Sequence, residues 1–221
     1  MNNKPLSQEG LKLIACVTML IDHVGAVFFP QNLWLRIIGR LAFPVYCFLL
    51  AEGVHYTKKP AKYALRLFIG LLLAELPFDL TFFGSFTWAH QSVMFTLLLA
   101  FLMGMLMKKL PLLGKLLAVI PFYFAAELLH TDYGGMGIIM CAVFLIGRKL
   151  PEALLFQAIG VLLVNLSYYS RSFIQPYAIL AMVPIALYSG KKATGSKWVQ
   201  RAFYLFYPAH LLVLGLISGI I

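Results

Sequence analysis

The stretch LKLIACVTMLIDHVGAVFF, Leu11 to Phe29, is long enough to cross a bilayer as a helix and carries an Asp next to a His. Because about 20 apolar residues span the hydrocarbon core, this run predicts a transmembrane helix. Ionisable side chains at such depth are costly and usually face a bundle interior or a water-filled cavity. Asp22 and His23 are therefore the first candidates for a functional site.

Helical geometry relates these two residues to Lys12 near the start of the same run. Lys12 and His23 lie on one helical face, about 16 Å apart along the axis, whereas Asp22 points about 100° away from His23. Adjacent residues on a helix do not face each other. We therefore expect the partners of Asp22 and of His23 to come from other helices.

The composition is typical of a membrane protein. Hydrophobic residues make up 62% of the 221 residues and charged residues 12%, and the mean hydropathy is +0.87. The formal charge of +10 comes from basic residues in short loops between apolar runs. This placement follows the positive-inside rule and does not indicate nucleic-acid binding. The bilayer is therefore the expected partner of most of the surface.

Apolar runs recur along the whole chain and predict an all-α, polytopic bundle of about nine membrane-spanning helices in a single domain, residues 1–221. The expected spans are 11–29, 34–56, 63–80, 92–107, 112–129, 136–146, 152–169, 173–188 and 198–221. A kink is expected in the second span near Pro44, because proline removes a backbone hydrogen bond. The run 136–146 is shorter than a usual span.

The positions of the basic residues predict the orientation. With the N-terminus in the cytoplasm and the C-terminus outside, only three of the 18 Lys and Arg residues fall at outer ends: Arg36, Arg40 and Arg171. The other fifteen fall at inner ends: Lys4, Lys12, Lys58, Lys59, Lys62, Arg66, Lys108, Lys109, Lys115, Arg148, Lys149, Lys191, Lys192, Lys197 and Arg201.

The second span carries charges at both ends. Arg36 and Arg40 share one helical face and repel each other unless a carboxylate or a ligand neutralises them. Four acidic residues, Asp22, Glu75, Asp79 and Asp132, fall in the same outer half of the predicted bundle. Near the inner end, Glu52 is expected to pair with Arg66 or Lys62 as a structural bridge.

Five segments together resemble the TraX family, whose named member acetylates the N-terminus of conjugative pilin. They are LKLIACVTMLIDHVG, RIIGRLAFPVYCFLLAEGVHYTKKPAKYALRL, SVMFTLLL, DYGG and KWVQRAFYLFYPAHLLVL. The resemblance covers nearly the whole chain, and its most specific parts are the Asp-His pair, the GR…FP…AEG…T run and the terminal YP-x-H. The family looks related to transmembrane acyltransferases in which a basic residue precedes a His on the first span, as Lys12 precedes His23.

The resemblance implies an acyltransferase of the bacterial inner membrane that uses acetyl-CoA or another acyl-CoA as co-substrate. His23 would be the general base, and the expected catalytic set is His23, Asp22, Arg40 and His210. The donor would contact Lys12, Arg66 and Lys197, and the acceptor would contact Arg36, Asp132, Tyr133 and Tyr207. His210 lies about 18 Å from the inner end of its span, a depth close to that of His23. The sequence has no H-E-x-x-H or C-x-x-C spacing, so no metal is expected.

Two other functions remain open at this stage. Asp22, His23, Arg40 and Glu52 could form the proton relay of a transporter or a lipid flippase, although we detect no internal repeat of the kind common in transporters. The chain could also be a non-catalytic assembly factor for a conjugation or pilus machine. A peptide N-terminus, a glycan and a small amine are all compatible acceptors.

Overall fold

The computed structural model describes residues 4–168, 172–191 and 197–219. Arg171 and Lys192, which entered the orientation count, lie outside the described residues, and so does the side chain of Lys197.

The all-α prediction is confirmed for the described part of the chain. The elements are α1 (Gln8–Phe28), α2 (Leu33–Gly39), α3 (Ala42–Tyr56), α4 (Pro60–Phe83), α5 (Val93–Met107), α6 (Leu112–Leu128), α7 (Gly134–Gly147), α8 (Ala153–Ser167), the 3-10 helix η1 (Gln175–Ala181), α9 (Met182–Ala186) and α10 (Lys197–Ser218). Each predicted span corresponds to one element or to two consecutive ones. The short run 136–146 is helical, as α7.

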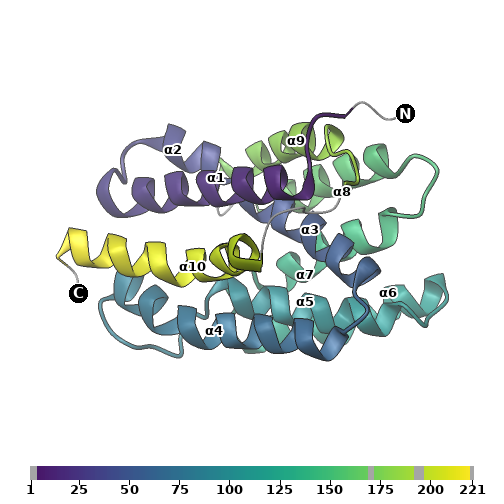
Figure 1. The fold of residues 1–221 in the computed structure, drawn as a ribbon, viewed down its shortest axis with the longest axis horizontal. Coiled ribbons are helices and arrows are strands. Elements are labelled where there is room, and N and C mark those ends of the chain that lie inside the picture. Colours follow the sequence, from purple (N-terminus) through teal and green to yellow (C-terminus); the bar gives the residue numbers. More distant parts are fainter. Residues whose placement is uncertain (1–3, 169–171, 192–196, 220–221) are drawn as a thin grey trace.

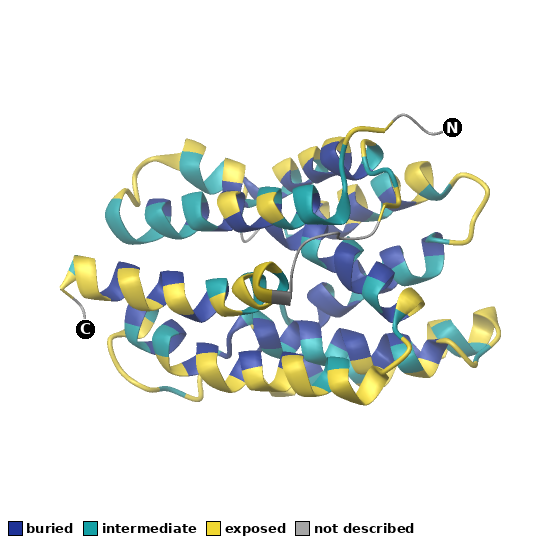
Figure 2. Ribbon diagram, in the orientation of Figure 1, coloured by how far each residue is buried: buried dark blue, intermediate teal, exposed yellow. Residues whose placement is uncertain are grey.

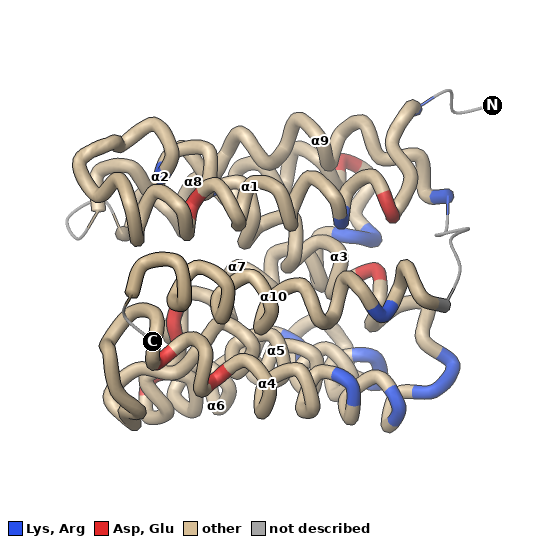
Figure 3. The backbone as a smooth tube through the Cα atoms, turned by 60° about the vertical axis from the view of Figure 1, so that its left-hand side comes forward, with Lys and Arg blue, Asp and Glu red and all other residues tan. Residues whose placement is uncertain are grey.

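The helices lie side by side and run mostly along the long axis of the molecule (Figure 1). One layer contains α1, α2, α8 and α9, and the other contains α4, α5 and α6. Between these layers, α3 runs diagonally and packs against α1 and α7, and α7 packs against α6 and α8. Helix α10 also lies between the two layers and packs against α4 and α1. The N-terminus and the C-terminus lie at opposite ends of the bundle. Most Lys and Arg residues gather towards the end near the N-terminus (Figure 3).

In the described part of the chain, three helical stretches are long and apolar enough to cross a membrane: Gln8–Phe28, Leu33–Tyr56 and Trp198–Ser218. Exposed residues line the outward faces of the helices, and buried ones face the bundle interior (Figure 2). On α4, Leu65 and Leu72 are exposed whereas Glu75 and Asp79 are buried. Apolar side chains outside and polar ones inside are typical of a helical membrane protein.

A break divides the predicted second span between α2 and α3, as the expected kink near Pro44 indicated. Pro44 has no N–H to donate to the carbonyl of Arg40 four residues earlier, and its ring clashes with that carbonyl. The helix therefore stops at Gly39 and restarts at Ala42. Arg40 occupies this break, at the C-cap of α2.

The predicted span 173–188 differs most from expectation. It is a 3-10 helix followed by the five-residue α9. Pro184 lacks the N–H that a regular α-helix would pair with the carbonyl of Leu180, and Pro176 lies in the first turn of η1. Pro184 therefore interrupts a continuous α-helix over this segment, whereas Pro176 is compatible with the first turn of a helix.

Candidate functional site

A cavity of 440 Å³ lies in the half of the bundle that contains the end of α1, and its wall includes Asp22 and His23. Arg36 and Arg40 reach it from α2 and its C-cap. Asp132 and Tyr133 line it from the α6–α7 connection, and Tyr207 lines it from α10. The structure therefore gathers seven residues that the sequence placed in one site. We call this space the outer cavity, after the end of the bundle that the sequence predicts to face outward.

Asp22 forms ion pairs with both Arg36 and Arg40. It is thus a carboxylate of the kind that the sequence analysis expected to relieve the repulsion between the two arginines. Nη2 of Arg40 donates to the two carboxylate oxygens of Asp22 at 2.7 and 2.8 Å. Nη1 of Arg36 lies 3.0 Å from Oδ2 of Asp22 and also donates to its backbone carbonyl at 2.9 Å. Two cations share one carboxylate, so this cluster carries a net positive charge beside the cavity.

Gly39 makes the close approach of α1 and α2 possible. A Cβ atom built at this position would overlap the Asp22 side chain. Only glycine leaves room there for the carboxylate to sit against the α2 backbone.

A buried amide, Gln175, binds Arg40 and is held in turn by a second buried amide, Asn165. Nη1 of Arg40 donates to Oε1 of Gln175 at 3.2 Å, and Nε2 of Gln175 donates to Oδ1 of Asn165 at 3.1 Å. Gln175 also lines the outer cavity, whereas Asn165 is fully buried behind it. We did not predict either residue from the sequence. A polar amide within an apolar segment was the available signal, since such groups are buried only with partners.

His23 meets His210 of α10 directly, which confirms the predicted match in depth. Nδ1 of His23 lies 2.7 Å from Nε2 of His210. The ring planes are within 7° of parallel and the ring centroids are 4.9 Å apart, so the rings meet edge to edge. Phe82 and Tyr207 lie edge-on to His23. The partners of Asp22 and His23 thus come from α2 and α10, as expected for adjacent residues.

Glu75 and Asp79 do not line the outer cavity, although the sequence placed them in the same outer half as Asp22. Glu75 accepts hydrogen bonds from the backbone and hydroxyl of Ser92, at 3.1 and 2.8 Å. Asp79 accepts one from the backbone N–H of Thr87 at 3.0 Å. Both carboxylates hold the α4–α5 connection, so their interactions are structural.

A second cavity, of 670 Å³, opens at the opposite end of the bundle, and we call it the inner cavity. Its wall includes Lys12 and Arg66, both predicted donor contacts, and also Arg201, which we had counted only for orientation. Arg66 lies over the rings of Tyr63 and Tyr204, 5.3 and 5.5 Å from their centroids. The inner cavity therefore combines cations with aromatic faces.

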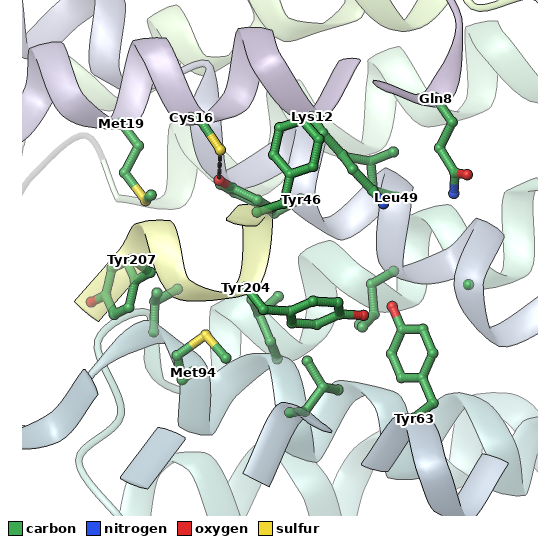
Figure 4. Close-up of a pocket in the computed structure, with 16 residues that line it drawn as sticks. Gln8, Lys12, Cys16, Met19, Tyr46, Leu49, Tyr63, Met94, Tyr204 and Tyr207 are labelled. Carbon is green, nitrogen blue, oxygen red and sulfur yellow. Dashed lines mark hydrogen bonds between the residues drawn. The ribbon is translucent and has the colours of Figure 1, made fainter. Parts of the chain in front are cut away.

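A smaller cavity of 160 Å³ is lined by residues that include Lys12, Tyr46 and Tyr204 (Figure 4), and we call it the central cavity. It shares Lys12 and Tyr204 with the inner cavity, and Tyr46 and Tyr207 with the outer one. The three cavities therefore follow one another along the bundle, with common walls. In the central one, the hydroxyl of Tyr46 lies 3.3 Å from Sγ of Cys16.

The expected pairing of Glu52 with Arg66 or Lys62 is wrong. Oε1 of Glu52 accepts from Nε of Arg148 on the α7 C-cap at 2.6 Å, and Oε2 accepts from the hydroxyl of Tyr188 at 3.3 Å. Arg148 reaches Glu52 because α3 packs against α7. Arg66 instead turns towards the tyrosine rings of the inner cavity.

The outer cavity thus places an imidazole beside a cationic cluster. An imidazole can accept a proton from an acceptor group, and nearby cations can stabilise negative charge that develops on a carbonyl oxygen. Within residues 4–168, 172–191 and 197–219, no group of three or more His, Cys, Asp or Glu side chains is arranged to hold a metal ion.

Comparison with known proteins places the chain in a family. The family model described as "TraX protein" matches residues 7–218. A protein of Dichelobacter nodosus named "Probable fimbrial assembly protein FimC, serogroup H1" is 32% identical, over 96% of this chain and 96% of its own length. Protein TraX of Escherichia coli is 24% identical over 97% of this chain and 88% of its own length. No solved structure matches the chain. Because the family model spans almost every residue, this protein belongs to the TraX family.

Proposed function

We propose that this protein is a membrane-embedded acyltransferase that moves an acetyl or other acyl group from cytoplasmic acyl-CoA to an amine or hydroxyl acceptor at the outer face. The observation that carries the proposal is the row of three cavities along the bundle. It begins among the cations of the inner cavity and ends at His23. Acyl-CoA has the matching form, with phosphates at one end and a reactive thioester at the other.

The inner cavity is the proposed donor site. Lys12, Arg66 and Arg201 line it, and cationic side chains suit the phosphates of the donor. The rings of Tyr63 and Tyr204 offer faces for the adenine base. Most Lys and Arg residues lie at this end (Figure 3). By the positive-inside rule this end faces the cytoplasm, in a bacterial inner membrane crossed about nine times.

The central cavity is the proposed path of the pantetheine arm. Its wall is mainly apolar and joins the inner and outer cavities through shared residues. The arm would run along the face of α1 that carries Lys12 and His23, about 16 Å apart along the axis. The thioester carbon would then reach the outer cavity next to His23.

His23 is the proposed general base, and the arginines are the proposed electrostatic stabilisers. His23 would take the proton of the acceptor as the acceptor attacks the thioester carbonyl. The net positive cluster of Asp22, Arg36 and Arg40 would stabilise the negative charge on the carbonyl oxygen. Asp132 and Tyr133 lie across the same cavity and are the proposed contacts of the acceptor.

A non-catalytic role in assembly is the second candidate, because the Dichelobacter nodosus relative is named as a fimbrial assembly protein. The two ideas are compatible if the acyl acceptor is a component of a surface appendage. Peptide N-termini, glycans and small amines all provide the amine or hydroxyl group that the proposed reaction needs.

The test uses the purified full chain in vesicles of known orientation. Radiolabelled acetyl-CoA is supplied on the Lys-rich side, and an impermeant peptide, sugar or amine acceptor is supplied on the other. We expect acetyl transfer in the wild type, a loss of about 10²- to 10⁴-fold in His23→Ala, and no loss in a control that removes the exposed His55 of α3.

Each other outcome contradicts part of the proposal. Transport of the acceptor without acetylation would favour a transporter. Near wild-type turnover in His23→Ala would remove the base assignment. Transfer only when both substrates are on one side would exclude delivery across the membrane. No activity in any arm would favour the assembly factor.

A further inference from the structure

His210, the second member of the histidine pair, also lies within hydrogen-bond distance of a backbone carbonyl oxygen. Nδ1 of His210 lies 2.7 Å from the carbonyl oxygen of Phe206, one helical turn earlier on α10. Nε2 of the same ring meets Nδ1 of His23 at 2.7 Å. Both nitrogens of His210 are therefore engaged, one by a carbonyl and one by a second imidazole.

This arrangement determines which nitrogens carry protons when both rings are neutral. A carbonyl oxygen can only accept, so the Nδ1 of His210 must carry its proton and donate to Phe206. The Nε2 of a neutral His210 is then an acceptor, and Nδ1 of His23 must donate to it. Consequently Nε2 of a neutral His23 is unprotonated.

Burial separates the roles of the two rings. His23 lines the outer cavity, whereas His210 does not and is 7% exposed. No hydrogen bond from the described part of the chain reaches Nε2 of His23. The pair therefore presents one basic nitrogen beside the cavity, and His210 lies behind it.

We propose that His210 is a positioning residue that selects the tautomer of His23, so that Nε2 of His23 is the atom that removes the proton of the acceptor. This inference rests on the proposed acyl transfer and assigns His210 a role other than contact with the substrate. An ordering partner on the second ring nitrogen is a general way to orient a catalytic imidazole.

These hydrogen bonds define the path of the proton during the proposed transfer. The acceptor N–H or O–H bond breaks as its N or O bonds to the acyl carbon, and the proton moves to Nε2 of His23. His23 is then an imidazolium that still donates through Nδ1 to His210. When the thioester C–S bond breaks, Nε2 returns the proton to the leaving thiolate. His210 remains neutral, and its bond to Phe206 is unchanged throughout.

The test compares His210→Gln with His210→Leu, two side chains of similar size in the full-length protein. A glutamine carbonyl oxygen can accept from Nδ1 of His23, whereas leucine cannot. We expect His210→Leu to lower kcat by about 10²-fold or more, the range of an incorrectly held base. The KM for acetyl-CoA should stay within about twofold, and His210→Gln should recover about tenfold in kcat.

Nitrogen-15 NMR of labelled histidine in the detergent-solubilised protein reports the tautomer of His23 and does not depend on acetyl transfer. In the wild type we expect His23 to be protonated at Nδ1 and unprotonated at Nε2. In His210→Leu we expect a mixture of His23 tautomers. A wild-type His23 protonated at Nε2, or equal kcat in the Gln and Leu variants, would overturn the proposal. An absence of acetyl transfer in the wild type, together with the expected NMR result, would contradict the acyltransferase function and leave the tautomer assignment intact.

Discussion

Two buried ionic clusters occupy opposite halves of the bundle and differ in their charge balance. In the outer half, Asp22 serves both Arg36 and Arg40, so one anion meets two cations. In the inner half, Glu52 meets Arg148 alone, so the charges cancel. The unbalanced cluster adjoins an imidazole at the wall of the outer cavity. The balanced pair joins α3 to α7, and of its two members Glu52 also reaches the wall of the inner cavity.

This difference in charge balance helps to distinguish structural from functional ionisable residues in apolar helices. A balanced pair satisfies itself and needs no ligand, so it mainly joins the helices that carry it. An unbalanced cluster beside a cavity keeps an attraction for a further anion. Asp132 lines the same cavity but pairs with His90, so an anionic ligand would meet the remaining attraction of the two arginines. We therefore propose that the outer cluster is functional and the inner pair structural. Two experiments test this distinction, and a third measures a weaker pair at the rim of the outer cavity.

Replacement of Asp22 should have the largest effect. Asp22→Ala would leave Arg36 and Arg40 facing each other without a carboxylate, and breaking such a buried pair costs about 3 to 5 kcal/mol of folding free energy. Thermal unfolding in detergent measures this loss, and acetyl transfer should disappear as well. The double variant Asp22→Ala with Arg40→Ala should regain part of the stability but not the transfer. If Asp22→Ala lost less folding free energy than Arg148→Met, a variant of the inner pair, the proposed difference between the two clusters would be wrong.

Replacement of Arg148 should have a smaller effect. Arg148→Met leaves Glu52 with the hydroxyl of Tyr188, and Glu52 can draw water from the inner cavity. We expect a loss of about 1 to 3 kcal/mol, as for a buried group that loses one partner. Because Glu52 lines the proposed donor site, its uncompensated charge should raise the KM for acetyl-CoA. Arg148 lines none of the three cavities, so a large fall in kcat would contradict the structural role.

The smallest effect is expected from a pair at the rim of the outer cavity. Nε2 of His90 lies 3.2 Å from Oδ1 of Asp132, and this hydrogen bond raises the pKa of His90 above 6.5. While Asp132 is ionised, the pair is therefore complete below the raised pKa of His90 and is lost as the pH rises through that pKa. Both side chains are more than one third exposed, so its effect on stability is slight.

Titration of His90 by NMR measures this effect directly. In the wild type the midpoint should lie above the ordinary value for histidine, and in Asp132→Asn it should move down towards that value. An unchanged midpoint in Asp132→Asn would show that another group sets the charge of His90.

Local patterns were sufficient for much of the fold. The apolar runs predicted the helical segments of the described chain, and Pro44 predicted a kink, which the structure shows as a break between α2 and α3. Helical periodicity also predicted that Asp22 and His23 would turn to different partners. These features depend only on residues close together in the sequence, which is why they could be predicted without the structure.

The partners of the buried acidic side chains were harder to predict from the sequence. Arg66 lies 14 residues from Glu52 in the sequence, yet Glu52 pairs with Arg148, which lies 96 residues away. Glu75 and Asp79 share the outer half with Asp22 but bind the α4–α5 connection. Each outcome depends on which helices are neighbours and how each is rotated about its axis, and hydropathy carries little information on either.

From the sequence alone, hydropathy established the helices, the distribution of Lys and Arg indicated an orientation, and the Asp-His pair marked the site, since each is a property of one segment. Only the tertiary structure showed that His210 bonds directly to His23, that Gln175 and Asn165 support Arg40, and that the two ionic clusters differ in charge balance. The physical reason is that buried polar groups must be satisfied by whatever side chain packing brings within hydrogen-bond reach, and packing joins residues far apart along the chain.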